Sequence, residues 1–550
     1  MTLQSTTTES SWWRGAVIYQ IYPRSFADSN HDGIGDINGI IDKLDYISEL
    51  GVDGIWLSPF FTSPMKDFGY DISNYRDVDP MFGSLSDFDS LIEKAHSLNL
   101  KVMIDQVISH TSDQHPWFGE SRKDSSNDKA DWYVWAEPQS DGTPPNNWLS
   151  VFGGSAWSWE PARKQFYLHN FLDSQPDLNF HNPVVVDQVL DDMRFWLERG
   201  VDGFRLDTAN FYFHDDELRN NPPRPKDVAA GGDMSNDVNL YSMQSHVYDK
   251  SRPENIEFLK KLRSLMNEYP NRTTVGEIGD DNSLKLMAEY TSGGDKLHMA
   301  YTFDLLAHDS GAEYIESVID SVESMIGDGW PCWAMSNHDV MRVATRWAEG
   351  DHQQDLIRLL HAILFSLRGS VCLYQGEELG LPEADVPFEK LQDPYGITFW
   401  PEFKGRDGCR TPMPWNSTDN HAGFSQEIPW LPVPSEHMDL TVAHQQQDLG
   451  STLNHCKALL AWRQQNRTLV QGDIKRLEAP EGVLAFHRFM DEHRVTLVFN
   501  LSNQTKLIGE ELLQQWGVKD HSSSLAVLAF DGAWLESDGD NNWVNFSQLT

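Results

Sequence analysis

Arg205 and Asp207 stand two residues apart inside an apolar segment, GFRLDTAN at residues 203–210. On a β-strand, residues i and i+2 point to the same side, so the guanidinium and the carboxylate are expected to face each other. A guanidinium that close stabilises the ionised carboxylate, so we expect a lowered pKa for Asp207. An ionised aspartate held in this way could act as a nucleophile. A structural ion pair is the alternative, and it is the better interpretation of such a pair that stands alone.

Other polar residues interrupt apolar segments in the same manner. They are Asp105 and His110 in KVMIDQVISH, Glu277 in TTVGEI, and His338 and Asp339 in PCWAMSNHD. Glu277 follows the apolar Val275, and a carboxyl group in dry surroundings keeps its proton more readily, as a general acid must. One ionised carboxylate beside one protonated carboxyl is what acid-assisted cleavage of a glycosidic bond needs. With a covalent intermediate, such a pair gives retention of configuration.

The segments that carry these residues belong to a regular alternation of apolar strands and amphipathic helices. Eight candidate strands lie at 16–23, 54–59, 101–110, 203–209, 273–278, 300–305, 331–339 and 370–378. Such alternation predicts a parallel sheet covered on both sides, and eight units favour an α/β fold of the (β/α)₈ TIM-barrel type. In that fold the C-terminal ends of the strands form the site. A shared site therefore explains polar residues on four strands better than separate ion pairs do.

Three stretches depart from the alternation and predict the domain boundaries. Residues 111–180, rich in Trp, Pro, Asn, Asp and Gly, predict a small domain inserted after the third strand. The barrel would then comprise residues 1–110 and 181–471, with a further insertion at about 381–440. Short alternating runs such as GVLAFHRF predict a C-terminal antiparallel β-sandwich domain over residues 472–550.

The composition restricts the partners and the compartment. Asp and Glu number 83 against 43 Lys and Arg, and a formal charge of −40 disfavours nucleic acid and anionic membranes as partners. A salt-rich habitat is one hypothesis for this charge, and activity that persists as salt is raised would agree with it. Four widely spaced cysteines, no pattern typical of a secretory signal and no apolar run near twenty residues favour a cytoplasmic protein with reduced thiols.

DQVISH, GFRLDTAN, VGEI and SNHD resemble, in order, the four signature segments of glycoside hydrolase family 13, the α-amylase superfamily, and QPDLN at 175–179 resembles a fifth. The resemblance covers nearly the whole chain. It implies that Asp207 is the nucleophile, Glu277 the general acid/base and Asp339 the transition-state stabiliser. It also implies that Arg205, His110 and His338 bind the sugar at the cleavage site, and that Asp105 gives structural support.

Further segments resemble the α-glucosidase and oligo-1,6-glucosidase-like members of that family. KDFGYD places Asp67 and Tyr70 where relatives fix the terminal glucose, and GRDGCRTPMPW supplies Arg406 as the partner of Asp67, with Arg410 as the alternative. Such a gate would admit one glucose and explain exo-action. The resemblance also puts Phe171 and Gln175 in the pocket wall, with Phe152 a further candidate. Core packing is the alternative for any single aromatic residue.

A separate constellation, DSNHDGIGD at 28–36, has the spacing of a cation-binding loop. The side chains of Asp28, Asn30, Asp32 and Asp36 and the carbonyl of Ile34 would supply an oxygen shell. Residue 39 is glycine, so the loop lacks the final acid of an EF-hand. The resemblance implies a structural Ca²⁺ or Mg²⁺ site, and hard oxygen donors disfavour zinc. The alternative is a turn that needs no ion. We expect no organic cofactor.

These features together predict a retaining, exo-acting α-glucosidase that acts on small α-glucosides and also transfers glucose. In the subfamily that the chain resembles, valine after the nucleophile accompanies α-1,6 activity, and alanine or threonine accompanies α-1,4 activity. Thr208 therefore indicates α-1,4 bonds as in maltose, with sucrose as an alternative. Two other interpretations stay open: a glucosyltransferase or isomerase that rearranges trehalose or sucrose, and a non-catalytic sugar-binding or transporter-associated subunit.

Overall fold

The computed structural model describes residues 11–225, 239–307, 309–348 and 353–502, and the shorter pieces 504, 506–508, 510–516, 524–529, 535–536 and 544–545. Eight parallel strands form its central sheet, one from each predicted segment. In hydrogen-bonded order they are β11 (Met299–Thr302), β10 (Thr273–Ile278), β9 (Gly203–Leu206), β5 (Lys101–Gln106), β2 (Gly54–Leu57), β1 (Val17–Ile21), β13 (Ser370–Tyr374) and β12 (Cys332–Trp333). A parallel bridge between Ala300 and Pro331 joins the two ends of this order. The sheet thus closes into the predicted (β/α)₈ barrel.

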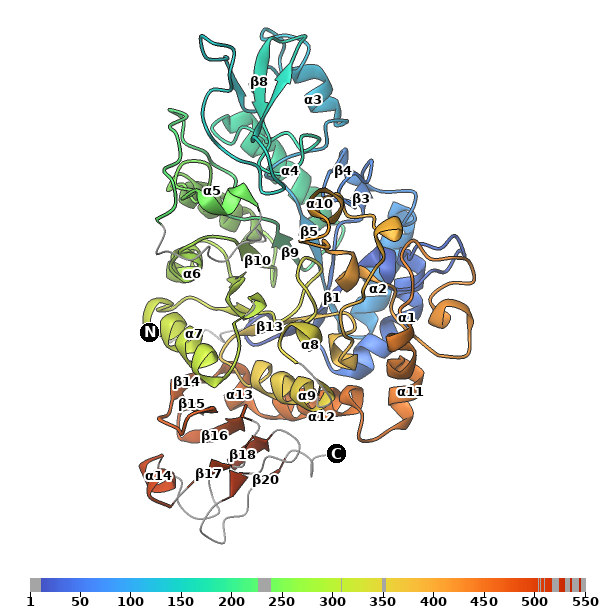
Figure 1. The fold of residues 1–550 in the computed structure, drawn as a ribbon, viewed down its shortest axis with the longest axis vertical. Helices are drawn as coiled ribbons and strands as arrows, with labels where there is room; N and C mark the ends of the chain where they lie inside the picture. The colour runs from blue at the N-terminus through green and yellow to red at the C-terminus, as the bar shows by residue number, and fades with distance from the viewer. Residues whose placement is uncertain are drawn as a thin grey trace, which may run out of the picture.

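Helices surround the barrel (Figure 1). They are α1 (Ile37–Leu50), α2 (Leu85–Ser97), α4 (Pro183–Glu198), α5 (Asn255–Met266), α6 (Ser283–Thr291), α7 (Ala312–Met325), α8 (Val343–Arg346), α9 (Gln353–Leu364) and α12 (Thr452–Gln465). Helix α2 shows why such a segment folds. Ser84 caps its first turn in a reciprocal pair of hydrogen bonds with Asp87, which is worth about 1 kcal/mol. Its buried face repeats at helical spacing, through Phe88, Leu91, Ile92 and Ala95.

The segment that follows β5 forms a small domain of its own. Its strands β6 (Trp135–Ala136), β8 (Gln165–Leu168) and β7 (Trp157–Glu160) pair antiparallel in that order, beside helix α3 (Pro116–Ser121). Trp148, Trp157 and Phe166 form part of its own buried cluster. The domain lies at one end of the molecule, and the C-terminal sheet lies at the other (Figure 1). Since it leaves the barrel after β5, it stands on the side where the barrel strands end.

Two further insertions border the same side of the barrel. The loop after β2 contains the hairpin of β3 (Phe61–Thr62) and β4 (Asn74–Val78). The stretch after β13 contains helices α10 (Pro394–Phe399) and α11 (Val442–Gln447) and several 3₁₀ turns. Each insertion contributes residues to the site described below.

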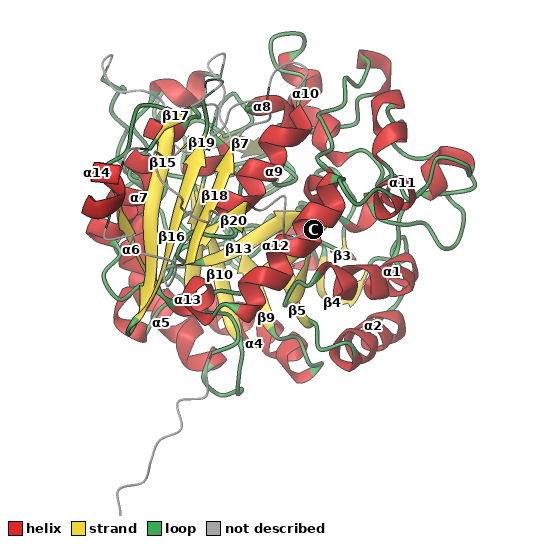
Figure 2. Ribbon diagram, turned by 90° about the horizontal axis from the view of Figure 1, so that it is seen from below, coloured by secondary structure: helices red, strands yellow, loops and turns green. Residues whose placement is uncertain are grey.

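The C-terminal region adds a second sheet. Strands β14 (Asp473–Arg476), β15 (Val483–Met490) and β16 (His493–Asn500) pair antiparallel, as predicted, and β18 (Ser524–Ala529) and β20 (Val544–Asn545) extend the sheet in parallel. Figure 2 shows β15 and β16 beside α7 and α13 (Arg467–Gln471). The short strands β17 (Lys506–Leu507) and β19 (Leu535–Glu536) pair separately, and α14 (Glu510–Gln515) lies nearby. The rest of the predicted β-sandwich lies outside the described residues.

Two general features bear on the earlier expectations. Within the described parts of the chain, no helix has both the length and the apolar character required to cross a bilayer. All four cysteines are free and buried, and the Sγ atoms of Cys332 and Cys372 lie 3.6 Å apart.

Candidate active site

One guanidinium joins three carboxyl groups at the C-terminal ends of neighbouring strands. Arg205 Nη1 lies 2.6 Å from Asp207 Oδ1 and 2.9 Å from Asp105 Oδ1, and Nη2 lies 2.6 Å from Glu277 Oε1. The arginine is on β9, which pairs with β5 on one side and β10 on the other, so the strand order brings these groups together. The ion pair anticipated at residues 205 and 207 is therefore part of a larger cluster.

The cluster holds more negative groups than its single cation can balance. Burial raises the pKa of Glu277 to about 7, as expected for a general acid. Burial also raises the pKa of Asp207 to about 7, despite Arg205, and the nearby charges of Asp105 and Asp339 act in the same direction. The expectation of a lowered pKa for Asp207 is wrong, because it considered Arg205 alone. Asp207 and Glu277 therefore titrate together near neutral pH, so the pair can hold one proton while one of the two carboxyls is ionised.

Each of the two central carboxyls has one oxygen held by Arg205 and one oxygen near Thr208. The Thr208 hydroxyl donates to Asp207 Oδ2 at 3.3 Å, and the Thr208 amide donates to Glu277 Oε2 at 3.3 Å. Thr208 adopts φ +41, a left-handed conformation that is strained for a β-branched residue. This turn directly after β9 places the residue between the two less tightly held oxygens.

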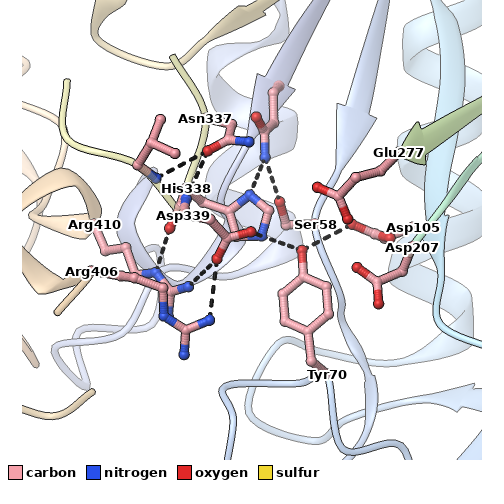
Figure 3. A network of polar contacts seen from close by, with 12 residues as sticks. Ser58, Tyr70, Asp105, Asp207, Glu277, Asn337, His338, Asp339, Arg406 and Arg410 are labelled. Atoms are coloured by element: carbon pink, nitrogen blue, oxygen red, sulfur yellow. Dashed lines mark hydrogen bonds and ion pairs between the residues drawn. The ribbon is translucent and has the colours of Figure 1, made fainter. Parts of the chain in front are cut away.

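Asp339 lies in a different electrostatic environment (Figure 3). Burial alone would raise its pKa, but the neighbouring guanidinium groups of Arg406 and Arg410 lower it below the usual range. Arg410 Nη2 lies 2.8 Å from Asp339 Oδ1, and Arg410 Nε donates to the His338 carbonyl at 2.7 Å. Asp339 is therefore the carboxylate of this site that stays ionised most readily.

His338 and Tyr70 connect Asp339 to the arginine cluster (Figure 3). His338 Nε2 lies 3.1 Å from Asp339 Oδ2 and also contacts the Tyr70 hydroxyl, which donates to Asp105 Oδ2 at 3.1 Å. On its other side His338 Nδ1 is 2.8 Å from Gln20 Nε2. Burial lowers the pKa of His338 well below its usual value, so the ring is neutral at neutral pH.

The expected contact between Arg406 and Asp67 is present. Arg406 Nη2 lies 2.8 Å from Asp67 Oδ1, and its Nη1 lies 3.2 Å from Asp339 Oδ1. Asp393 holds the same guanidinium through Oδ1 at 2.8 Å and Oδ2 at 3.1 Å. Arg410, the alternative partner, contacts Asp339 instead. Arg406 thus links the loop after β2 to the insertion after β13.

A pocket at this end of the barrel collects most of the predicted substrate-binding residues. Its lining comprises Asp67, Tyr70, His110, Phe152, Phe171, Gln175, Asp207, Thr208, Asp339 and Arg406. The rings of Phe152 and Phe171 are 5.8 Å apart, and the Arg406 guanidinium lies 5.0 Å above the Phe152 ring. Gln175 Nε2 donates to Asp67 Oδ2 at 3.1 Å. The buried Arg205, Glu277 and His338 bond to this lining from behind it.

Sequence reasoning missed three residues of this network. Tyr301 lies on β11 and bonds to both Arg205 and Glu277. It pairs in register with Glu277 on β10, so aligning these two strands could have revealed it. Gln20 is a lone polar residue in the apolar strand VIYQI, a signal of the same kind as Arg205. Asp393 lies in an insertion without periodic pattern, where no sequence signal marks it as a partner of Arg406.

In the predicted cation loop, hydrogen bonds inside the protein engage all three aspartates, and Asp32 accepts the backbone amide of Ile34. Asp28 accepts the backbone amides of Asn30, His31 and Gly33, and Asp36 accepts the amide of Gly39 at the start of α1. In the part of the chain that the structure describes, no three His, Cys, Asp or Glu side chains converge as a metal site would require. The predicted donors are all oxygens, which match Ca²⁺ or Mg²⁺ chemistry.

Comparisons with known proteins agree with this geometry. The family model for the alpha amylase catalytic domain matches residues 20–472. The chain is 56% identical over 515 residues to a probable alpha-glucosidase of Rhizobium meliloti, and the alignment covers 92% of this chain and 93% of that protein. It is 36% identical over 530 residues to the oligo-1,6-glucosidase of Parageobacillus thermoglucosidasius, and that alignment covers 90% of this chain and 92% of the relative. The crystal structure of the alpha-glucosyl transfer enzyme XgtA is similar with a TM-score of 0.89 and 59% identity, over 90% of this chain and 92% of that one.

Proposed function

The chain belongs to the alpha-amylase family, and on that premise we propose that it is a retaining, exo-acting α-glucosidase that hydrolyses terminal non-reducing bonds of small α-glucosides. One observation carries the proposal: Arg205 bonds to both Asp207 and Glu277 beneath a pocket that Asp67 and Arg406 border. Because both carboxyls contact one guanidinium, they are held close together. This favours the separation of about 5–5.5 Å used by retaining enzymes over the wider spacing of inverting ones.

In the proposed mechanism the two carboxyls act in sequence. Asp207 attacks the anomeric carbon through Oδ2, the oxygen that Arg205 does not hold, while Glu277 gives its proton to the glycosidic oxygen. The bond between that carbon and oxygen breaks, and glucose remains bound to Asp207 as an ester. Glu277, now ionised, takes a proton from water, and the hydroxide that forms releases glucose with its original configuration.

The surrounding charges account for binding and exo-action in this proposal. Ionised Asp339 would bind substrate hydroxyls and stabilise positive charge that develops on the sugar ring. His110, His338 and Arg205 would fix the glucose unit at the cleavage site. The Asp67–Arg406 pair would end the pocket after one glucose, and Phe152 and Phe171 would cover the apolar face of the ring.

The linkage preference rests on Thr208. Relatives of the chain include both a probable alpha-glucosidase and an oligo-1,6-glucosidase, so the names alone do not decide between α-1,4 and α-1,6 bonds. We propose α-1,4 bonds, as in maltose, because threonine occupies the position after the nucleophile and lines the pocket. Sucrose is the alternative substrate.

Glucosyl transfer is the second candidate function. The similarity to the alpha-glucosyl transfer enzyme XgtA, at 59% identity, favours it. The same glucosyl-enzyme intermediate can be attacked by a sugar hydroxyl in place of water. Product analysis at high maltose concentration separates the two: free glucose alone indicates hydrolysis, whereas longer or rearranged glucosides indicate transfer.

The experiment that tests the main proposal measures glucose release from maltose by the wild type and by Asp207→Asn. We expect an active wild type and a variant whose rate is lower by at least about 10³-fold, since the amide cannot form the ester. If both proteins are folded and equally inactive on every α-glucoside, the chain is a sugar-binding subunit.

We further propose a structural Ca²⁺ or Mg²⁺ held by Asp28, Asn30, Asp32, Asp36 and the Ile34 carbonyl, because all five of these ligands are hard oxygen donors. A cytoplasmic location is also proposed, since the four cysteines are free and buried. Cell fractionation would test it. The formal charge of −40 supports the view that neither nucleic acid nor an anionic membrane is a partner.

A further inference from the structure

Tyr301 contacts the general acid from behind the pocket. It lies on β11, paired in register with Glu277 on β10, and its ring is buried in a barrel cluster that includes Trp56 and Val275. The ring is 1% exposed and is not part of the pocket lining. Tyr301 therefore reaches the reaction through other side chains and does not itself touch a sugar in the pocket.

The hydrogen-bond directions at the Tyr301 hydroxyl are fixed by its partners. Arg205 Nε and Nη2 lie 3.2 Å and 2.9 Å from the phenolic oxygen, and a guanidinium can only donate. The phenolic oxygen must accept these bonds, which leaves its proton for Glu277 Oε1, 2.8 Å away. Burial raises the pKa of Tyr301 well above its usual value, so the phenol keeps this proton.

These bonds make the two oxygens of Glu277 unequal. Oε1 accepts from Tyr301 and also lies 2.6 Å from Arg205 Nη2, so a hydrogen bond and an ion pair both hold it. A proton on Oε1 would compete with both of them. Oε2 accepts only the long bond from the Thr208 amide among the described residues, and Thr208 lines the pocket. The carboxyl proton is therefore favoured on Oε2.

We propose that Tyr301 is a positioning residue that fixes the transferable proton of Glu277 on Oε2 and so directs the general acid toward the glycosidic oxygen. This inference rests on the proposed function. In the step concerned, the proton leaves Oε2 for the glycosidic oxygen as the bond to the anomeric carbon breaks. The electron pair of that bond goes to the leaving oxygen, and Asp207 forms the new bond to carbon. Tyr301 and Arg205 then stabilise the carboxylate that Glu277 becomes.

The direction of the pH effect follows from the groups that face Glu277. They are Arg205 and Asp207 from β9 and its end, Asp105 from β5, Asp339 after β12, and Tyr301 from β11. Burial raises the pKa of Glu277, Asp207 and Asp339 raise it further, and Arg205 and the Tyr301 hydrogen bond lower it. Removing the phenolic hydroxyl removes a donor to the carboxylate form, so the pKa of Glu277 rises. The acid then stays protonated to a higher pH.

The test compares Tyr301→Phe with the wild type on two substrates across pH. Maltose has a poor leaving group that needs the proton, whereas 4-nitrophenyl α-glucoside releases a nitrophenolate that needs it much less. We expect kcat/KM on maltose to fall by about tenfold or more, within the range that proton transfer contributes. We expect a much smaller loss on the aryl glucoside, and the alkaline limb of the maltose profile should move to higher pH.

Tyr19→Phe is the matched control. Tyr19 is equally buried on β1 and donates to a buried glutamate, Glu378, at 2.7 Å, away from the pocket. We expect this variant to lose stability without moving the alkaline limb or changing the ratio between the two substrates. The inference is overturned if Tyr301→Phe keeps the wild-type alkaline limb, or if it loses activity equally on both substrates.

A second measurement applies if Tyr301→Phe does not fold. Site-specific 3-fluorotyrosine at position 301 keeps the size of the side chain and makes the phenol a stronger donor. The alkaline limb should then move to lower pH, and an unchanged limb would overturn the inference. A wild type that releases no glucose from any α-glucoside would instead refute the proposed function, so the two failures are distinct.

Discussion

Arg406 and Asp67 stand 339 positions apart in the sequence, yet Nη2 of the arginine lies 2.8 Å from Oδ1 of the aspartate. Asp67 comes from the loop after β2, and Arg406 comes from the insertion after β13. Both side chains are buried, and Asp393 holds the arginine from a second direction. Two insertions that interrupt the barrel pattern thus meet to border the pocket, which is the arrangement that exo-action on a single terminal glucose requires.

Arg406→Lys tests this border. A lysine offers one point charge and cannot reach Asp67, Asp393 and Asp339 together, so buried carboxylates lose their partner. We expect kcat/KM on maltose to fall by about 30-fold or more, the usual consequence of breaking a buried charge pair. Arg122→Lys, at a more exposed pair with Glu160 in the inserted domain, serves as the control and should change little. Unaltered kinetics in Arg406→Lys would contradict the role of the pair.

Thr208→Val tests the linkage preference. Valine has nearly the same shape and tolerates the strained backbone as poorly as threonine does, but it puts a methyl group where the hydroxyl donates to Asp207 Oδ2. We expect turnover of isomaltose to rise relative to maltose. Thr208→Ser keeps the hydroxyl and should retain the wild-type ratio. The prediction fails if the ratio stays the same in Thr208→Val, or if the wild type already cleaves isomaltose faster than maltose.

Asp177→Asn tests a buried carboxyl in the segment QPDLN. Burial raises the pKa of Asp177 to about 8, and Oδ1 has no hydrogen-bond partner among the described residues. This pKa is higher in the folded state than in the unfolded state, where it is near 3.9. The stabilising contribution of the protonated carboxyl is therefore complete below about pH 4. It is lost as pH rises through about 8.

Asparagine mimics the protonated acid, so the variant should lose less stability over that interval. The measurement is the decrease in Tm between pH 5 and pH 8.5 for each protein, which should be smaller in Asp177→Asn. Other titrating groups are common to both proteins and cancel in the comparison. An equal decrease in the two would mean that Asp177 is not protonated in the folded state at pH 5.

Asp28→Ala tests the proposed cation loop. We expect Ca²⁺ or Mg²⁺ added to metal-free wild type to raise Tm, since an ion that binds only the folded state stabilises it. The variant should show no such rise. Comparing the rise, and not Tm itself, removes the effect of the loop hydrogen bonds that Asp28 also makes. Asp141→Ala, in an exposed turn of the inserted domain, is the control. A wild type that neither binds nor responds to either ion would exclude the site.

The barrel was predictable because each strand is a short apolar run that lies between helical patterns. Strand ends were less predictable. The segment predicted at 331–339 forms a strand only over Cys332–Trp333, beside the bridge from Pro331 to Ala300, and its polar end at 337–339 lies outside the ladder. The carboxylate cluster was found from polar residues within strands. The raised pKa of Asp207 could not be predicted in this way, because it depends on three carboxyls that share Arg205. Asp393 lies in an irregular insertion, where no sequence pattern marks it.

The central claim is double displacement through Asp207 and Glu277, and the most direct test is the anomer of glucose first released from maltose. Proton NMR spectra recorded within the first minutes, before mutarotation, identify it. The account predicts that α-glucose appears first and that β-glucose follows only as mutarotation proceeds. If β-glucose appears first, water attacks the sugar directly, and Asp207 is not the nucleophile.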